Sequence, residues 1–307
     1  MESPLLDLSA VPDGFRSGYV ALVGAPNAGK STLMNALLGT KLSIVTDKPS
    51  TTRHRVLGIL TDDAYQVIFL DTPGVVEPRY KLHEHMMHDV ERALADADLV
   101  LFLSDAEKRS VADRALARLS DQIADTPCLL VLTKMDLISH EEALPLVEEY
   151  VALRAFDDVI PTSAVSGFNL DALRDAIVER LPEGPPYYPP DQLSEHPERF
   201  FIAEIVREQI FKRFRAEIPY STQVNVIVYE EREGQKDFCD CEIVVERDAQ
   251  KGILIGKRGA ALKRLGAAAR HEIEAFTGRA LYLQLHVKTR ADWRNRDGFL
   301  RSYGYGS

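Results

Sequence analysis

Short apolar runs alternate with longer amphipathic stretches through the first part of the chain. The runs have the length of buried strands and lie at residues 19–23, 56–60, 66–70, 99–103, 128–132 and 158–162. Helical spacing recurs from near Lys30 and over residues 81–95, 111–123, 140–154 and 170–181. Asn169 is the predicted N-cap of the last helix. Because strands and helices alternate, the pattern predicts a doubly wound, mostly parallel α/β domain over residues 17–182.

The pattern changes in the remaining residues. Residues 183–198 are rich in proline, which excludes helix and central strand and predicts a semi-rigid interdomain linker. Beyond it, helices at 200–216 and 260–277 and strands at 222–230, 237–246 and 281–288 predict a smaller α+β domain over residues 199–307. The tail 290–301 is expected to pack as a last helix, with Trp293 as an anchor rather than a base-stacking platform. Residues 1–16 are expected to form a loose leader.

Charge divides along the same boundary. From Arg199 onward there are 20 Lys and Arg against 15 Asp and Glu, a net of +5, whereas the preceding residues carry a net of −15. This division predicts a polyanionic partner for the second domain alone. No apolar run has the length of a membrane span, and the first residues lack the layout of a secretory signal. With only three cysteines, the composition favours a reducing cytoplasm.

Residues 24–31 read G-A-P-N-A-G-K-S, which fits the phosphate-binding pattern G-x-x-x-x-G-K-S between a strand and a helix. Glycines allow the backbone N–H groups to face one centre, and the positive end of the next helix points there too. Lys30 is expected to contact the β- and γ-phosphates, and Ser31 to bind Mg²⁺. The alternative is a chance glycine turn before a helix. The predicted nucleotide-binding residues are Gly24, Ala25, Pro26, Asn27, Ala28, Gly29, Lys30, Ser31 and Thr32.

Three later motifs identify the expected nucleotide as GTP. Asp71, Thr72, Pro73 and Gly74 end one strand, with Asp71 expected to hold Mg²⁺ through water and Gly74 to donate its N–H to the γ-phosphate. Thr133, Lys134, Met135 and Asp136 end another, and Asp136 can accept from both N1–H and the N2 amine of guanine, a donor pair that adenine lacks. Ser163 and Ala164 end a third, with a backbone N–H for guanine O6. All three motifs follow the carboxyl ends of strands, which is where α/β proteins bind ligands.

Residues 50–54, S-T-T-R-H, lie between the first helix and the second strand. In nucleotide switches with a phosphate-binding loop, this segment carries a threonine that joins Mg²⁺ when the γ-phosphate is present. Thr52 is the predicted ligand and Thr51 the second choice; a plain loop is the alternative. Val75 stands where many switch GTPases carry a water-orienting Gln, so hydrolysis must rely on other groups. Asn27 is a candidate ligand for a potassium ion beside the phosphates. The expected catalytic residues are therefore Lys30, Thr52, Gly74 and Asn27.

Residues 251–259, K-G-I-L-I-G-K-R-G, contain a G-x-x-G loop with two basic residues inside it and a predicted helix after it. Two glycines allow a nucleic-acid backbone to come close, and the flanking residues 249–270 include six basic and no acidic ones. This predicts the clamp of a KH module, which grips about four nucleotides of a single strand. The alternative is a helix C-cap turn with a solvated basic face. The expected RNA-binding residues are Lys251, Ile253, Ile255, Gly256, Lys257, Arg258, Gly259, Lys263 and Arg264.

Taken in order, G-A-P-N-A-G-K-S, S-T-T-R-H-R, D-T-P-G, K-M-D, S-A and I-G-K-R-G resemble the Era family of bacterial ribosome-assembly GTPases, which join a TrmE-Era-EngA-like GTPase domain to a type II KH domain. The resemblance covers about residues 18–293. Thr133 departs from it, because the family usually has Asn there to tether the phosphate loop, and a Thr hydroxyl replaces part of that role. Ala25 and Ala28 stand in place of a usual Arg and Val.

The resemblance implies a slow GTPase with GTP or GDP and Mg²⁺ that binds the 3′ end of 16S rRNA during maturation of the 30S subunit. It also implies a monomer in the cytoplasm, with loose peripheral association with the inner membrane in some settings. We expect the nucleotide state to change how the acidic domain sits against the KH surface. The alternatives are an RNA-binding module with a structural, non-hydrolysing nucleotide site, and a tRNA-modifying or iron-transport GTPase.

Overall fold

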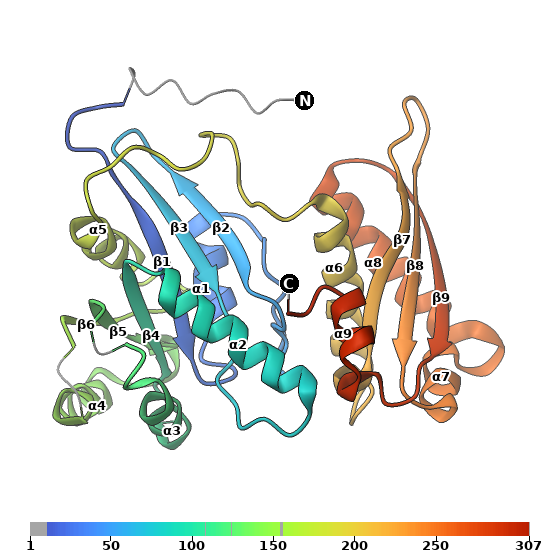
Figure 1. Ribbon diagram of the computed structural model, residues 1–307, viewed down its shortest axis with the longest axis horizontal. Coiled ribbons are helices and arrows are strands. Elements are labelled where there is room, and N and C mark those ends of the chain that lie inside the picture. The colour runs from blue at the N-terminus through green and yellow to red at the C-terminus, as the bar shows by residue number, and fades with distance from the viewer. Residues whose placement is uncertain (1–10, 108, 124, 154–155, 307) are drawn as a thin grey trace. The chain divides into compact units, whose positions relative to one another are not determined.

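The computed structural model describes residues 11–107, 109–123, 125–153 and 156–306 (Figure 1). Most of the predicted leader therefore lies outside the described residues. Contacts divide the chain into two units, each with its own core. The first unit comprises the described residues of Met1–Ser43, Thr52–Glu77 and Met86–Glu195, and the second those of Ile44–Thr51, Pro78–His85 and His196–Ser307. Two short segments of the earlier sequence, residues 44–51 and 78–85, thus group with the second unit.

The first unit is built on a six-stranded sheet in the order β2-β3-β1-β4-β5-β6. All neighbouring strands run parallel except β2, which is antiparallel to β3. The central strands are buried on both faces, which explains why their sequences are continuous apolar runs rather than alternating ones. The strands are β1 (Arg16–Gly24), β2 (Val56–Thr61), β3 (Tyr65–Asp71), β4 (Leu99–Asp105), β5 (Cys128–Thr133) and β6 (Asp158–Pro161). This confirms the predicted fold class.

Helices cover both faces of this sheet. Apolar side chains of α2 (Lys81–Asp96), α3 (Arg109–Leu119) and α4 (His140–Leu153) share one core with the strands, including Val90, Leu116 and Tyr150. Helices α1 (Lys30–Leu38) and α5 (Leu170–Arg180) contact each other, and Figure 1 shows α1 behind the strands and α2 in front of them. The carboxyl ends of the parallel strands therefore deliver their loops to one edge of the sheet, as the positions of the motifs require.

Asn169 occupies the predicted N-cap position of α5, but the predicted capping by its side chain is wrong. Asn169 precedes the helix in the left-handed conformation, at φ 62°, and makes no side-chain cap. Its amide instead donates to the carbonyl oxygen of Pro161 at 3.0 Å. Asparagine is tolerated because it is one of the few residues that adopts positive φ readily. The side chain fastens the end of β6 rather than the start of the helix.

The proline-rich segment is not a free spacer over its whole length. Gln66 of β3 accepts from the backbone N–H groups of both Tyr187 and Tyr188, at 2.7 and 2.9 Å. Further along, the backbone N–H of Ile59 donates to the carbonyl of Leu193. Residues 183–195 accordingly belong to the first unit. Proline removes donors from a chain but leaves its carbonyls, so an extended proline-rich segment can still lie along a sheet edge.

The part of the second unit after residue 195 packs helices against one face of a three-stranded sheet in the order β7-β8-β9. Strands β7 and β8 are antiparallel, and β8 and β9 are parallel. Ile202, Val206 and Ile210 of α6 and Leu265 and Ile273 of α8 form the core with the strands. The elements are α6 (Glu198–Arg213), β7 (Gln223–Glu230), β8 (Asp237–Val245), α7 (Asp248–Ile255), α8 (Ala260–Thr277), β9 (Leu281–Thr289) and α9 (Asp297–Ser302).

Trp293 is fully buried, and its indole N–H donates to the carbonyl oxygen of Ser221 at 2.9 Å. The expectation of an anchor is therefore met, because a buried ring offers no face to a base. Among the helices of the described residues, none is long and apolar enough to cross a membrane.

Candidate nucleotide site and basic loop

The phosphate-binding sequence forms a tight loop between β1 and α1. Gly24, Asn27 and Gly29 all adopt positive φ, at 149°, 63° and 91°. At Gly24 a Cβ would lie 2.4 Å from the carbonyl oxygen of Leu103, so only glycine fits there. Gly29 is the N-cap of α1 and has no side chain to cap the helix. The N–H groups at the start of α1 are thereby left for an anion.

Lys30 lies inside this loop rather than in solvent. Its ammonium donates to the carbonyl oxygens of Gly24 and Ala25, at 3.2 and 3.0 Å. Burial lowers the pKa of Lys30 to about 8, and the Asp71 carboxylate opposes this shift. A buried cation whose hydrogen-bond partners here are two neutral carbonyls would be better stabilised by a phosphate, because a nearby anion offsets the desolvation of its charge.

The three predicted Mg²⁺ ligands come together. The Ser31 hydroxyl donates to Asp71 Oδ2 at 2.6 Å, and its oxygen lies 2.9 Å from Thr52 Oγ1. Asp71 is fully buried, and its Oδ1 has no hydrogen-bond partner among the described residues. Burial raises the pKa of Asp71, while the Ser31 bond and the Lys30 charge lower it. A carboxylate with an orphaned oxygen beside two hydroxyls is a donor set that suits a hard divalent cation.

The geometry distinguishes Thr52 from Thr51. The Thr51 hydroxyl lies 2.6 Å from that of Thr46 and 2.8 Å from the carbonyl oxygen of Lys48. Thr51 is thus engaged within its own segment, whereas Thr52 reaches Ser31. Thr52 therefore stays the predicted Mg²⁺ ligand.

Gly74 packs directly against the phosphate loop. A Cβ at this position would lie 2.7 Å from Pro26 Cα and 2.8 Å from Pro26 N, so a side chain cannot be added without displacing the loop. The next residue, Val75, is buried, and its N–H donates to the carbonyl oxygen of Gly24 at 3.0 Å. Val75 therefore fastens the segment to the loop and supplies no polar side chain to a water molecule.

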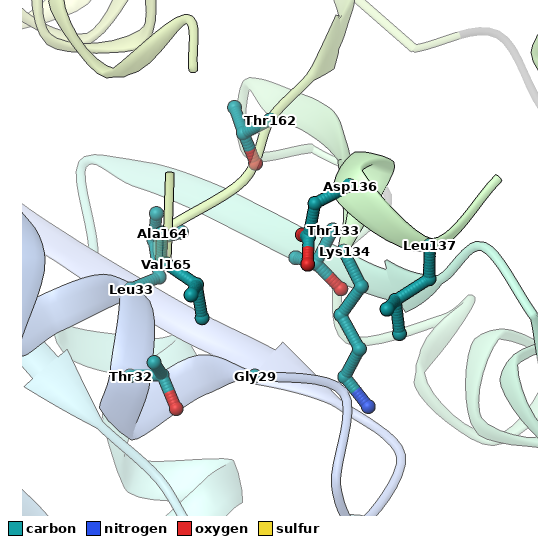
Figure 2. Close-up of a pocket in the computed structure, with 10 residues that line it drawn as sticks. All are labelled: Gly29, Thr32, Leu33, Thr133, Lys134, Asp136, Leu137, Thr162, Ala164 and Val165. Carbon is teal, nitrogen blue, oxygen red and sulfur yellow. The ribbon is translucent and has the colours of Figure 1, made fainter. Parts of the chain in front are cut away.

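A cavity of about 300 Å³ opens beside the phosphate loop (Figure 2). Figure 2 shows Lys134, Asp136 and Leu137 on one side of it, and Leu33, Ala164 and Val165 on the opposite side. Its lining residues are Gly29, Thr32, Leu33, Thr133, Lys134, Asp136, Leu137, Thr162, Ala164 and Val165. Apolar groups on both sides with one carboxylate at the edge suit a flat, polar-edged base.

Two side chains that line the pocket, or lie beside it, are held by polar contacts. Ser163 donates to Asp136 Oδ1 at 2.6 Å, which orients the carboxylate. Lys134 donates to the buried Asp105 at 2.6 Å, so its stem is stretched along the cavity. Sequence reasoning missed Asp105, although its position at the end of β4, on the same sheet edge as the motifs, is a signal that could have found it.

Thr133 performs the tether expected of it. Its hydroxyl donates to the carbonyl oxygen of Ala28 in the phosphate loop at 2.8 Å and lies 3.1 Å from the carbonyl oxygen of Ser104. Leu137 and Val165 were not predicted as lining residues. Both are largely exposed, at 54% and 82%, so their apolar surfaces are available for contact with a ligand.

The basic G-x-x-G loop connects α7 to α8. Helix α7 was not predicted, because residues 248–255 mix polar and apolar positions over only two turns. Gly256, Arg258 and Gly259 adopt positive φ, at 71°, 52° and 75°. Lys257 and Arg258 are exposed, as are Lys263 and Arg264 on the first turns of α8. Lys251 is half-buried on α7.

The two isoleucines before the loop have different surroundings. Ile255 packs against the core of the second unit, whereas Ile253 is 55% exposed. The sequence left open whether these residues face bases or core. The structure assigns Ile255 to the core and leaves Ile253 as an apolar contact beside an exposed basic loop.

One edge of the doubly wound sheet carries a phosphate loop, a Ser–Asp–Thr cluster and a base pocket with a single carboxylate. Together these features define a guanine-nucleotide-binding protein. The second unit has the element order of a type II KH domain. Residues 19–134 match the family described as 50S ribosome-binding GTPase, and residues 206–294 match the KH domain family. The chain belongs to the Era family of GTPases. It is 49% identical over 294 residues to the chloroplastic GTPase ERA-like protein of Arabidopsis thaliana, covering 95% of this chain and 69% of that one.

Solved structures agree with this assignment. A variant of Aquifex aeolicus Era bound to GDP and aluminium fluoride is 39% identical, with a TM-score of 0.90, over 95% of this chain and all of the other. Era in complex with MgGDPNP and nucleotides 1506–1542 of 16S ribosomal RNA is 40% identical, with a TM-score of 0.91 and the same coverage. The protein is therefore a GTPase that uses guanine nucleotides and Mg²⁺, and a non-hydrolysing nucleotide site is not supported.

Proposed function

We propose that this protein is a GTP-dependent switch that binds the 3′ end of 16S ribosomal RNA and assists maturation of the 30S subunit. The observation that carries the proposal is the likeness, over 95% of the chain, to Era in complex with a 3′ segment of that RNA. The exposed cations of the loop between α7 and α8 support it, because single-stranded RNA is held largely through its phosphates.

In this proposal the first unit binds the nucleotide through residues of known geometry. Lys30 exchanges its loop carbonyls for phosphate oxygens, and the start of α1 adds its N–H groups. Ser31, Asp71 and Thr52 hold Mg²⁺, which supplies positive charge to the β- and γ-phosphates when it is bound. Asp136 accepts from N1–H and N2 of guanine while Ser163 holds it, and Ala164 donates its N–H to O6.

Hydrolysis needs a water molecule in line with the γ-phosphate, and Val75 cannot orient it. We assign the positioning of this water and the stabilisation of the phosphate charge to the phosphate loop and the segment packed against it. Gly74 offers its N–H beside Pro26, and Asn27, held at positive φ, is the proposed ligand of a potassium ion that supplies charge in place of an arginine. GTP turnover is expected to be faster in potassium than in sodium, and an Asn27→Ala variant should lose that difference. Equal rates of phosphate release in the two salts would contradict a role for potassium.

Ribosomal RNA binding is tested most directly in cells. Crosslinking followed by RNA sequencing should recover reads from the 3′ end of small-subunit rRNA with the native chain and lose them with the double variant Lys257→Asp/Arg258→Asp. The matched control is Lys236→Asp/Arg301→Asp, which makes the same change of charge at exposed positions away from the loop. Equal loss of reads in both variants would show an effect of net charge alone and would contradict a specific clamp.

The cellular setting stays a prediction. A cytoplasmic location, a monomeric state and loose membrane association come from the resemblance, and fractionation and light scattering test them.

A further inference from the structure

Thr133 is the last residue of β5 and is almost fully buried, at 5% exposure, in the wall of the base pocket. It lies three residues before Asp136, the carboxylate proposed to read the base. Figure 2 places both side chains on the same side of the cavity. Its position makes Thr133 a candidate to contact the edge of a bound purine.

The only donor of a threonine side chain is its hydroxyl proton. In Thr133 that proton is directed to the carbonyl oxygen of Ala28 at 2.8 Å, with the Ser104 carbonyl oxygen as the next acceptor at 3.1 Å. Both partners can only accept, so either bond consumes the proton. Turning it toward a ligand would leave a buried loop carbonyl without its partner, which is unfavourable.

The other polar side chains that line the pocket are also engaged or distant. Lys134 donates to Asp105 at 2.6 Å, and the Thr162 hydroxyl is directed to the carbonyl oxygen of Leu132. Thr32 lies on α1 on the phosphate-loop side of the cavity in Figure 2, away from Asp136. Lys134 keeps further N–H donors, but Figure 2 shows its ammonium at the far end of the stem, away from Thr133 and Asp136. Among the described lining residues, then, no side chain beside Asp136 has a hydrogen-bond donor left for the base.

Guanine presents N2, N1, O6 and N7 in that order around its edge. With Asp136 on N2 and N1 and the Ala164 N–H on O6, N7 is the next atom along, and N7 can only accept. We infer that this pocket reads guanine through N1, N2 and O6 and leaves N7 unread, so that it accepts guanine nucleotides altered at position 7. This rests on the roles proposed above for Asp136 and Ala164. Selectivity for guanine over adenine is unaffected, because it comes from the other three atoms.

Displacement of a fluorescent GDP from the full-length protein with Mg²⁺ tests the inference. The competitors are GDP, 7-deaza-GDP, in which a C–H replaces N7, and IDP, which lacks the N2 amine. We expect 7-deaza-GDP to compete within about twofold of GDP, and IDP to compete at least about tenfold more weakly, because it leaves part of a carboxylate unpaired. Discrimination against 7-deaza-GDP of fivefold or more would overturn the inference while leaving the GTPase assignment intact.

Competition by IDP distinguishes a failure of the proposed guanine pose from a failure of the inference about N7. Equal competition by IDP and GDP would show that Asp136 does not read N2, and would overturn the proposed pose together with this inference. The variant Thr133→Asn supplies a free amide donor and should acquire a preference for GDP over 7-deaza-GDP of about two- to tenfold. The variant Thr133→Ser keeps one hydroxyl proton for Ala28 and should stay indifferent to position 7. If Thr133→Asn does not fold, the native and Thr133→Ser proteins still decide the question.

Discussion

Lys30 shows how the site is prepared for an anion at the level of a single side chain. The ammonium is buried among loop carbonyls, which are weaker partners for a cation than phosphate oxygens. Burial in this environment lowers the pKa of Lys30 to about 8. A nucleotide phosphate in the loop favours the charged form and raises the pKa again.

Nucleotide binding should therefore take up a proton above neutral pH. In the free protein Lys30 loses its proton above about pH 8, whereas in the complex it stays charged, so affinity falls as pH rises through that value. Calorimetric titration of GDP in buffers of different ionisation enthalpy should give little uptake at pH 7 and close to one proton at pH 9. A Lys134→Arg control should keep this uptake, and its absence at pH 9 in the native chain would contradict the buried ammonium.

Asp136 should control which base is accepted. Replacing it by Asn keeps the size but exchanges one acceptor oxygen for a donor amide, which opposes the N2 amine of guanine and suits the carbonyl that xanthine carries there. We expect the affinity of Asp136→Asn for GDP to fall by roughly 100-fold, the effect of losing charge-assisted hydrogen bonds, and that for xanthosine diphosphate to rise. Competition binding measures both, and retention of GDP affinity would remove Asp136 from the base edge.

At the level of elements, the turn between α7 and α8 depends on one glycine more than on the others. A Cβ on Gly256 would lie 2.7 Å from that of Ala261, and its φ of 71° is unfavourable for other residues. Gly252, one turn earlier on α7, has open space and no positive φ. These two glycines form a matched pair for substitution.

Gly256→Ala should displace the basic loop and weaken RNA binding by at least about tenfold, whereas Gly252→Ala should leave it unchanged. Fluorescence anisotropy with a labelled single-stranded RNA at fixed salt measures the affinities, and circular dichroism checks that both variants are folded. Equal RNA affinity of the two variants would mean that the turn does not hold the RNA.

Trp293 should contribute to stability rather than to RNA recognition. Trp293→Phe removes the bond to the Ser221 carbonyl and leaves a gap in a fully buried site, so the free energy of unfolding should fall by roughly 1–3 kcal/mol. Urea unfolding gives this quantity. An unchanged midpoint with weakened RNA binding would instead return Trp293 to a stacking role.

The elements themselves were largely predictable, because strands buried on both faces and helices with one apolar side leave clear periods in the sequence. The motif residues of the nucleotide site were predictable, because each motif follows the end of a predicted strand. Pairings between distant segments were not. Nothing local in the sequence indicates that Gln66 accepts from the backbone of Tyr187 or that Asn169 bonds backward to Pro161. Asp105 could be expected at the sheet edge because it ends a strand, but its pairing with Lys134 could not. Each of these depends on which segments meet in the folded chain.

At the scale of the whole molecule, one chain joins a guanine-nucleotide site to a KH domain. The net charge of +5 from Arg199 onward favours RNA on that part of the chain alone, because the preceding residues carry a net charge of −15. RNA affinity should accordingly fall steeply with salt, in proportion to the number of phosphates that the loop cations neutralise. Lys257→Asp/Arg258→Asp should flatten that dependence, and Lys236→Asp/Arg301→Asp should preserve its slope.

As a GTP-dependent switch, the protein is expected to let the nucleotide and the RNA affect each other's binding. Thermodynamic linkage requires any such effect to be reciprocal and of equal size. The decisive measurement is the affinity of the full-length protein for an RNA of the 16S 3′ end, taken with Mg²⁺ and either GDPNP or GDP. We predict affinities that differ by about fivefold or more, with the ratio of GDPNP to GDP affinity shifted by the same factor when RNA is present. Identical RNA affinities in the two nucleotide states would contradict the account.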